Sequence, residues 1–126
     1  MNRILSVFSL FALTFTIVSA QSVSGDSNGN GIRDDVDSLI SSMASSYSLQ
    51  APQLSAVAQV ARSQQYILSA NPQNRAQAIE IAKRDAAATN CASSRLPGTL
   101  MEIVYSRIET ATFNTVERQA AQDYYI

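Results

Sequence analysis

The sequence contains no histidine and only one cysteine among its 126 residues. Without histidine, the chain lacks the commonest general base and the commonest zinc ligand. Cys91 cannot form a disulfide within the chain, because a bridge needs two cysteines. Its thiol is therefore either buried as a small hydrophobic group or paired with another chain. Small residues surround Cys91 near the end of a predicted helix, and this favours burial.

The basic residues are spread along the sequence and form no run. Without Arg3, eight basic and ten acidic residues remain, which gives a net charge of about −2. This distribution argues against nucleic acid or an anionic membrane surface as a partner. Four of the acidic residues lie within residues 26–37, so one bound divalent ion would nearly neutralise the chain.

Residues 1–20 have the pattern of a secretory signal peptide. Arg3 gives a positive start, residues 4–18 are largely apolar, and residues 18–20 form a small-residue cleavage site. The apolar stretch is short for a bilayer span, which needs about 20 residues. We expect an exported chain, periplasmic or secreted, with no stable membrane anchor after cleavage. An uncleaved N-terminal anchor is the alternative.

Residues 26–37 carry oxygen-bearing side chains at the first, third, fifth, ninth and twelfth positions, with a glycine at the sixth. Calcium takes six to eight oxygen ligands, and this is the ligand spacing of an EF-hand loop. The glycine, Gly31, can adopt the positive φ that a sharp reversal needs. The backbone carbonyl at the seventh position would also face the ion. The predicted calcium ligands are Asp26, Asn28, Asn30, Ile32, Asp34 and Asp37.

The loop leads directly into a predicted helix. Asp34 and Asp37 stand in capping-box spacing, so Asp34 is expected to be the N-cap. The Ile32 side chain is expected to turn to the core, and Arg33 to point to solvent. The alternative is an Asn/Gly/Asp turn that caps a helix and binds no metal, because these residues favour turns in any case.

The run Asp-x-Asn-x-Asn-Gly-Ile-x-Asp-Asp at residues 26–35 resembles the loops of thrombospondin type 3 repeats, dockerins and other EF-hand-like calcium-binding repeats. The resemblance covers twelve residues and implies a metal-binding role, not a whole fold or an activity. Only the short flexible arm 21–25 precedes the loop, too little for an entering helix. The twelfth residue, Asp37, is shorter than the usual Glu. We therefore expect weak affinity, on the order of 10⁻⁴–10⁻³ M.

Apolar residues recur at helical spacing in four segments, approximately 34–47, 52–70, 73–92 and from 99 onward. Short loops between four amphipathic helices predict an all-α fold, a small up-down bundle that follows the calcium loop within one domain, 26–126. Three details concern the last helix. Thr99 and Glu102 form a predicted capping box, a fresh cap at Asn114-Thr115 predicts a kink or restart, and residues 124–126 are expected to dock on the bundle.

The chain offers no catalytic constellation. Glu102 and Glu109 lie two helical turns apart, which suits a solvated helix face better than a sugar-cleaving pair. Arg62, Gln65 and Arg107 lie close to apolar stripes, where they either line a polar pocket or extend along the edge of the bundle into solvent.

Together these features favour an exported helical protein with a structural calcium loop that works as a binding module, with a protein partner in the envelope or outside the cell. Two alternatives stay open. One is a small all-helical hydrolase or mutase with Arg62, Arg107 and Glu102 in a deep polar pocket. The other is an inhibitor or immunity-type binder, which would expose a contiguous apolar patch larger than a few hundred Å².

Overall fold

The computed structural model describes residues 23–71 and 73–124, and within these ranges the secondary structure is helical, with no strand. The predicted all-α fold is confirmed. The predicted signal peptide and the last two residues lie outside the described residues. No described helix is both long and apolar enough to span a bilayer. The helices are α1 (Asp34–Ser46), α2 (Ala51–Ser69), α3 (Arg75–Arg95), α4 (Gly98–Thr112) and α5 (Val116–Asp123).

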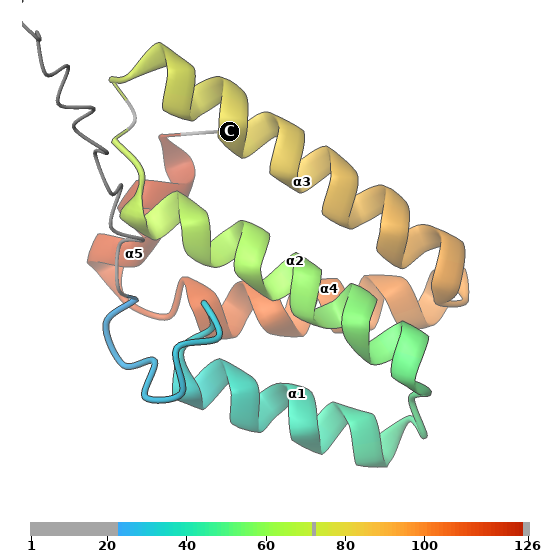
Figure 1. Cartoon of the computed structure of the whole chain (residues 1–126). Coiled ribbons are helices and arrows are strands. Elements are labelled where there is room, and N and C mark those ends of the chain that lie inside the picture. The colour runs from blue at the N-terminus through green and yellow to red at the C-terminus, as the bar shows by residue number, and fades with distance from the viewer. Residues whose placement is uncertain (1–22, 72, 125–126) are drawn as a thin grey trace, which may run out of the picture.

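Successive long helices run in opposite directions, because the segments between them are short (Figure 1). Helix α2 lies between α1 and α3, with α4 behind it, and it contacts each of the other four helices. Because α2 has neighbours on several sides, its buried residues lie on more than one face of the helix. They are Ala56, Val57, Val60, Ala61, Ser63, Gln64 and Gln65.

Two helices begin at other residues than the predicted N-caps. Helix α1 already includes Asp34, and its N-cap is Arg33, which makes no side-chain capping bond. The Asp34 carboxylate is turned back to Ser27 instead, so the predicted Asp34 cap is wrong. Helix α4 begins at Gly98 with Pro97 as its N-cap, two residues before the expected cap at Thr99. Thr99 therefore lies inside the helix, and its predicted capping box is also wrong.

The predicted restart near Asn114-Thr115 is confirmed and produces a fifth helix. The Thr115 hydroxyl accepts a hydrogen bond from the Arg118 backbone N–H at 3.3 Å, as an N-cap does. The count of four helices was one too low because this cap ends one helix and begins another. Tyr124, just after α5, is 60% exposed but lines a space that it shares with residues of α2, α3 and α4, and the other two residues expected to dock, 125 and 126, lie outside the described residues.

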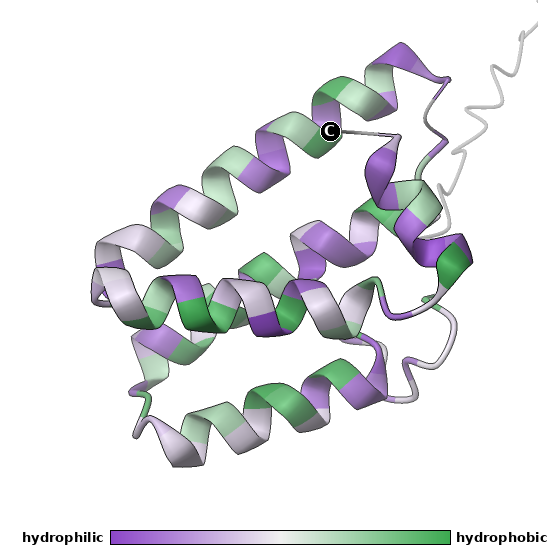
Figure 2. Ribbon diagram, turned by 180° about the vertical axis from the view of Figure 1, so that it is seen from behind, coloured by the Kyte–Doolittle hydropathy of each residue, from purple (hydrophilic) through white to green (hydrophobic). Residues whose placement is uncertain are grey.

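The core is built mainly from aliphatic side chains of the loop, α1, α2 and α4, with small residues of α3. Figure 2 shows α3 mostly in pale green and purple, because alanine and polar residues make up most of it. Alanines bury little area each, so α3 contributes less apolar burial than the other long helices. Cys91 is half-buried and packs against this core, so the interpretation as a small hydrophobic group is the better one.

The buried and exposed isoleucines of α4 provide a test of this packing. Ile108 is fully buried, whereas Ile103 on the same helix is 42% exposed. We expect Ile108→Ala to lower the free energy of unfolding by about 2–5 kcal/mol, because it leaves a cavity in the core. Ile103→Ala is the matched control and should cost well under half as much in urea denaturation. Equal costs would contradict the packing of α4.

Candidate metal-binding loop

The backbone of residues 26–37 forms a closed loop at the start of α1. The Asp34 N–H donates to the Gly25 carbonyl at 2.8 Å and closes the base of the loop. Gly29 and Gly31 have φ values of 71° and 83°. The positive φ predicted for Gly31 is confirmed, and it lets the chain reverse between Asn30 and Ile32.

The Asp26 carboxylate organises the first half of this loop. Its Oδ1 accepts the backbone N–H groups of Gly29 at 2.8 Å and Asn30 at 3.2 Å. Its Oδ2 accepts the N–H of Gly31 at 2.8 Å. Three consecutive amides therefore converge on one side chain. A carboxylate has about four lone-pair sites, so Asp26 keeps the capacity to bind one more partner.

The two asparagines meet the carboxylate at the end of the loop. Asn30 Nδ2 and Asn28 Nδ2 both donate to Asp37 Oδ2, at 2.8 and 3.2 Å. Each asparagine oxygen accepts the backbone N–H two residues further on, from Asn30 and from Ile32. The structure thus brings Asn28, Asn30 and Asp37 together directly. Asp26 is linked to this group through the backbone N–H of Asn30.

The other two predicted ligands, Asp34 and Ile32, do not take part in this hydrogen-bonded group. Asp34 Oδ1 accepts the backbone N–H and the hydroxyl of Ser27, at 3.0 and 3.1 Å. These bonds fasten the second residue of the loop to the ninth, and no bond joins Asp34 to Asp37 in the described part of the chain. The Ile32 side chain is 1% exposed and packs in the core, as predicted.

The carboxylates of Asp26 and Asp37 are held by neutral donors. Within residues 23–71 and 73–124, Asp26 and Asp37 form no ion pair with a lysine or arginine. The same residues contain no group of three or more histidine, cysteine, aspartate or glutamate side chains placed to hold a metal. Any metal site here would therefore depend on asparagine and backbone oxygens besides the aspartates.

Arg33 was expected to point to solvent, and this prediction is wrong. The residue is only 6% exposed. Its guanidinium donates to Asp35 Oδ2 at 2.8 Å and to the backbone carbonyls of Ala111 at 2.7 Å and Thr112 at 3.4 Å. Burial is possible because the unsatisfied carbonyls at the end of α4 accept its N–H groups. The hydrogen bonds from Arg33 also hold the pKa of the Asp35 carboxyl below its usual value.

A second arginine attaches the loop to α2. Arg62 Nε donates to the Asn30 carbonyl at 2.8 Å. The loop is thus bonded through Arg62 to α2 and through Arg33 to the end of α4, besides being continuous with α1. These contacts could not be predicted from the sequence, because a backbone carbonyl that accepts a hydrogen bond from a residue far along the chain is not marked by residue type or spacing.

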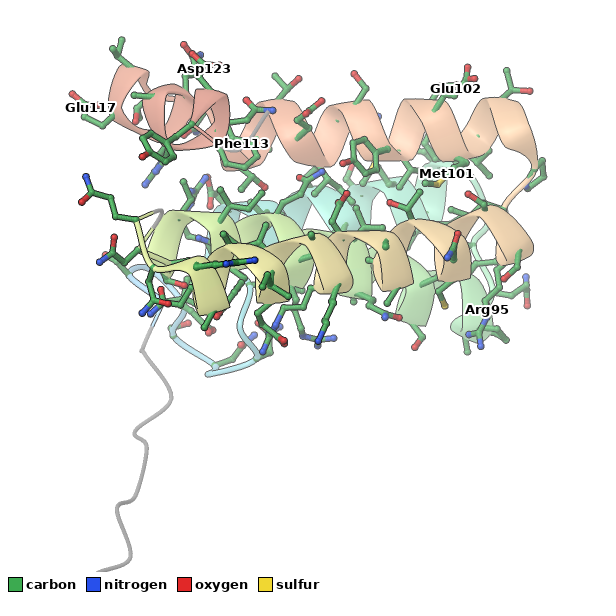
Figure 3. All side chains as sticks on the ribbon, turned by 90° about the horizontal axis from the view of Figure 1, so that it is seen from above. Arg95, Met101, Glu102, Phe113, Glu117 and Asp123 are labelled. Atoms are coloured by element: carbon green, nitrogen blue, oxygen red, sulfur yellow. The ribbon has the colours of Figure 1, made fainter. Side chains whose placement is uncertain are left out.

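The other candidate residues do not form a common site. Arg62, Glu102 and Arg107 are all exposed, and Figure 3 shows Glu102 pointing away from the neighbouring helices. Arg107 donates to the Tyr47 hydroxyl at 3.4 Å. Gln65 is buried, with its Oε1 lacking a hydrogen-bond partner among the described residues. The deep polar pocket that the enzymatic alternative requires of Arg62, Glu102 and Arg107 is not formed.

Comparison of the chain with protein-family models, with curated proteins and with solved structures gave no match. The loop geometry therefore has to carry the functional argument.

The buried arginine provides a test of how the loop is fastened. We expect Arg33→Met to lower the free energy of unfolding by about 1.5–3 kcal/mol, because it removes charged hydrogen bonds to α4 and Asp35. Arg75→Met, at an exposed position at the start of α3, is the matched control and should change it by less than about 0.5 kcal/mol. Urea denaturation measures both. Equal effects would contradict the anchoring role of Arg33.

Proposed function

We propose that the protein is an exported helical binding module in which residues 26–37 bind one calcium ion for a structural purpose. In this proposal α1–α4 are the four members of an up-down bundle, α5 packs on one end of it, and the ion fixes the loop at that end. The ligands are those predicted from the sequence, namely Asp26, Asn28, Asn30, Ile32 through its carbonyl, Asp34 and Asp37.

The observation that carries the proposal is the convergence of neutral donors on two carboxylates without a cationic partner. Three backbone N–H groups hold Asp26, and two asparagine amides hold Asp37. Neutral hydrogen bonds orient a negative charge but do not cancel it. A hard divalent cation between the two carboxylates would cancel it, and calcium accepts the mixture of carboxylate, amide and carbonyl oxygens available here.

Binding would require a small local rearrangement. Both asparagine Nδ2 groups now point toward Asp37, and N–H donors are repelled by a cation. The two amides would therefore turn so that their oxygens face the ion, while Asp37 exchanges two amide donors for calcium. The backbone would change little, because Gly29, Gly31 and the Asp26 hydrogen bonds already give the loop its turn.

The attachments of the loop support a structural purpose over a sensor. Residues 23–25 form a turn, so the part of the chain that the structure describes has no helix entering the loop that could open when the ion binds. Arg62 joins the loop to α2 and Arg33 joins it to α4, so a rigid loop would hold three helices in register. We expect calcium to add about 1 kcal/mol to the stability when it stands a few-fold above its dissociation constant.

Thermal unfolding with and without calcium tests the proposal. At about 5 mM calcium the midpoint should rise by roughly 4–8 °C, because about 1 kcal/mol has this effect in a domain of about 100 residues. Asp37→Asn should abolish the rise, while Asp123→Asn, at an exposed position on α5, should keep it. Magnesium at the same concentration should have a smaller effect, because it demands a tighter octahedral shell. An unchanged midpoint with calcium would refute the site.

Asn30→Asp separates a calcium loop from a turn that binds nothing. The change removes the 2.8 Å hydrogen bond to Asp37 and places two carboxylates together, so the metal-free protein should become less stable. The added charge should at the same time tighten calcium binding, because the charge of the ligands sets the affinity of such loops.

Calorimetric titration and melting in a chelator measure the two effects of Asn30→Asp. A turn without a metal predicts the loss of stability alone. The opposite signs of the two effects would therefore support the proposal, and destabilisation without calcium binding would refute it.

A further inference from the structure

A cavity of about 530 Å³ lies between α2, α3, α4 and α5. Its volume falls within the range of about 300–1,000 Å³ that is typical of small-molecule sites. Ile67, Ile81 and Phe113 provide large apolar walls. Figure 3 shows Phe113 where α4 meets α5, and this residue is one of those that line the cavity. None of the predicted calcium ligands lines it.

The cavity exists because α3 presents small side chains to it. Ala78, Ala82 and Ala86 recur every four residues on α3 and all line the space. Residues four apart lie on the same face of a helix, so these three positions leave one strip of α3 without bulky groups. Helix α3 packs mainly on α2 and meets α4 only briefly, which keeps the space open.

Gln64 of α2 lines this cavity with an unsatisfied amide. The residue is 2% exposed, and neither its nitrogen nor its oxygen forms a hydrogen bond of good geometry among the described residues, although its amide lies close enough to the Tyr105 hydroxyl to act on the pKa of that group. Burying such a group without a partner costs free energy, and most native proteins avoid it. An amide that can both donate and accept, on a residue that lines a cavity, can be satisfied by a ligand with polar groups.

The polar groups near Gln64 are acidic or neutral. Asp85 and Glu109 line the cavity, together with the hydroxyl of Tyr105, and no lysine or arginine does. The Tyr105 hydroxyl donates to Asp85 at 3.4 Å, and Gln122 donates to Glu109 at 2.6 Å. Burial, and then the charge of Asp85, raise the pKa of Tyr105, so its hydroxyl stays neutral. Two carboxylates without a cation give the cavity a negative potential.

We propose that this cavity binds a small organic cation, a protonated amine with an apolar body. The ammonium group lies between Asp85 and Glu109 and donates to their oxygens. The apolar body rests on Ile67, Ile81 and Phe113. The amide of Gln64 gains its missing partner from a polar group of the ligand or from a water carried in with it. This site is independent of the calcium loop.

Calorimetric titration of the purified protein with 2-phenylethylamine, in saturating calcium, tests the proposal. A dissociation constant of about 1 mM or below is expected for a ligand of this size. The neutral 2-phenylethanol and the anionic 3-phenylpropionate have similar apolar bodies and should bind at least about tenfold more weakly. Equal binding of all three compounds would overturn the proposed charge selectivity, and absence of amine binding at about 10 mM would overturn the site.

Two variants locate the binding within the cavity. Ala82→Leu fills the strip on α3 and should abolish amine binding, while Ala87→Leu, on the same helix but outside the cavity lining, should keep it. Equal affinities in these two proteins would overturn the assignment.

Gln64→Met keeps the side-chain volume and removes the unsatisfied amide. It should raise the melting midpoint of the ligand-free protein and lower the affinity for 2-phenylethylamine at least about tenfold. Both effects are expected of a residue that serves binding and lowers stability. Unchanged amine affinity in this variant would overturn the role of Gln64.

Discussion

Two carboxylates that, among the described residues, are held by neutral donors and by no cation are the constraint on which the start of this fold depends. Asp26 collects three consecutive backbone N–H groups, and Asp37 collects two asparagine amides. The resulting loop is compact enough to seat Ile32 in the core. It also presents the Asn30 carbonyl to Arg62 of α2. The loop is therefore a structural junction, and its uncompensated charge gives the reason to propose an ion within it.

The fold could be predicted from the sequence where the controlling interactions are local. Helical spacing of apolar residues placed α1 within one residue of its observed end, and the restart at Thr115 followed from its capping side chain. Two predicted helix caps were wrong, one because its side chain bonds elsewhere and one because the helix starts earlier. Asp34 turned to Ser27 and so did not cap α1, and Gly98 extended α4 past the expected cap at Thr99.

The candidate loop was predictable in its backbone and its first carboxylate but less so in its surroundings. The spacing of Asp26, Asn28, Asn30 and Asp37 reflects contacts made within twelve residues. The side chains of Asn28, Asn30 and Asp37 do form one hydrogen-bonded group, which the backbone N–H of Asn30 joins to Asp26. The burial of Arg33 depends instead on carbonyls at the end of α4, 78 and 79 residues away. Likewise, the unsatisfied amide of Gln64 depends on how α3 crosses α2, which periodicity does not encode.

The most direct test of the central claim follows the two asparagine side chains during a calcium titration by ¹⁵N nuclear magnetic resonance. The account predicts that the side-chain amide signals of Asn28 and Asn30 and the backbone signal of Gly31 shift together and saturate at millimolar calcium. Signals from the middle of α3 should stay in place. A calcium concentration of about 10 mM is roughly ten times the highest dissociation constant expected for the loop. Asparagine signals that do not shift at this concentration would contradict a metal in this loop.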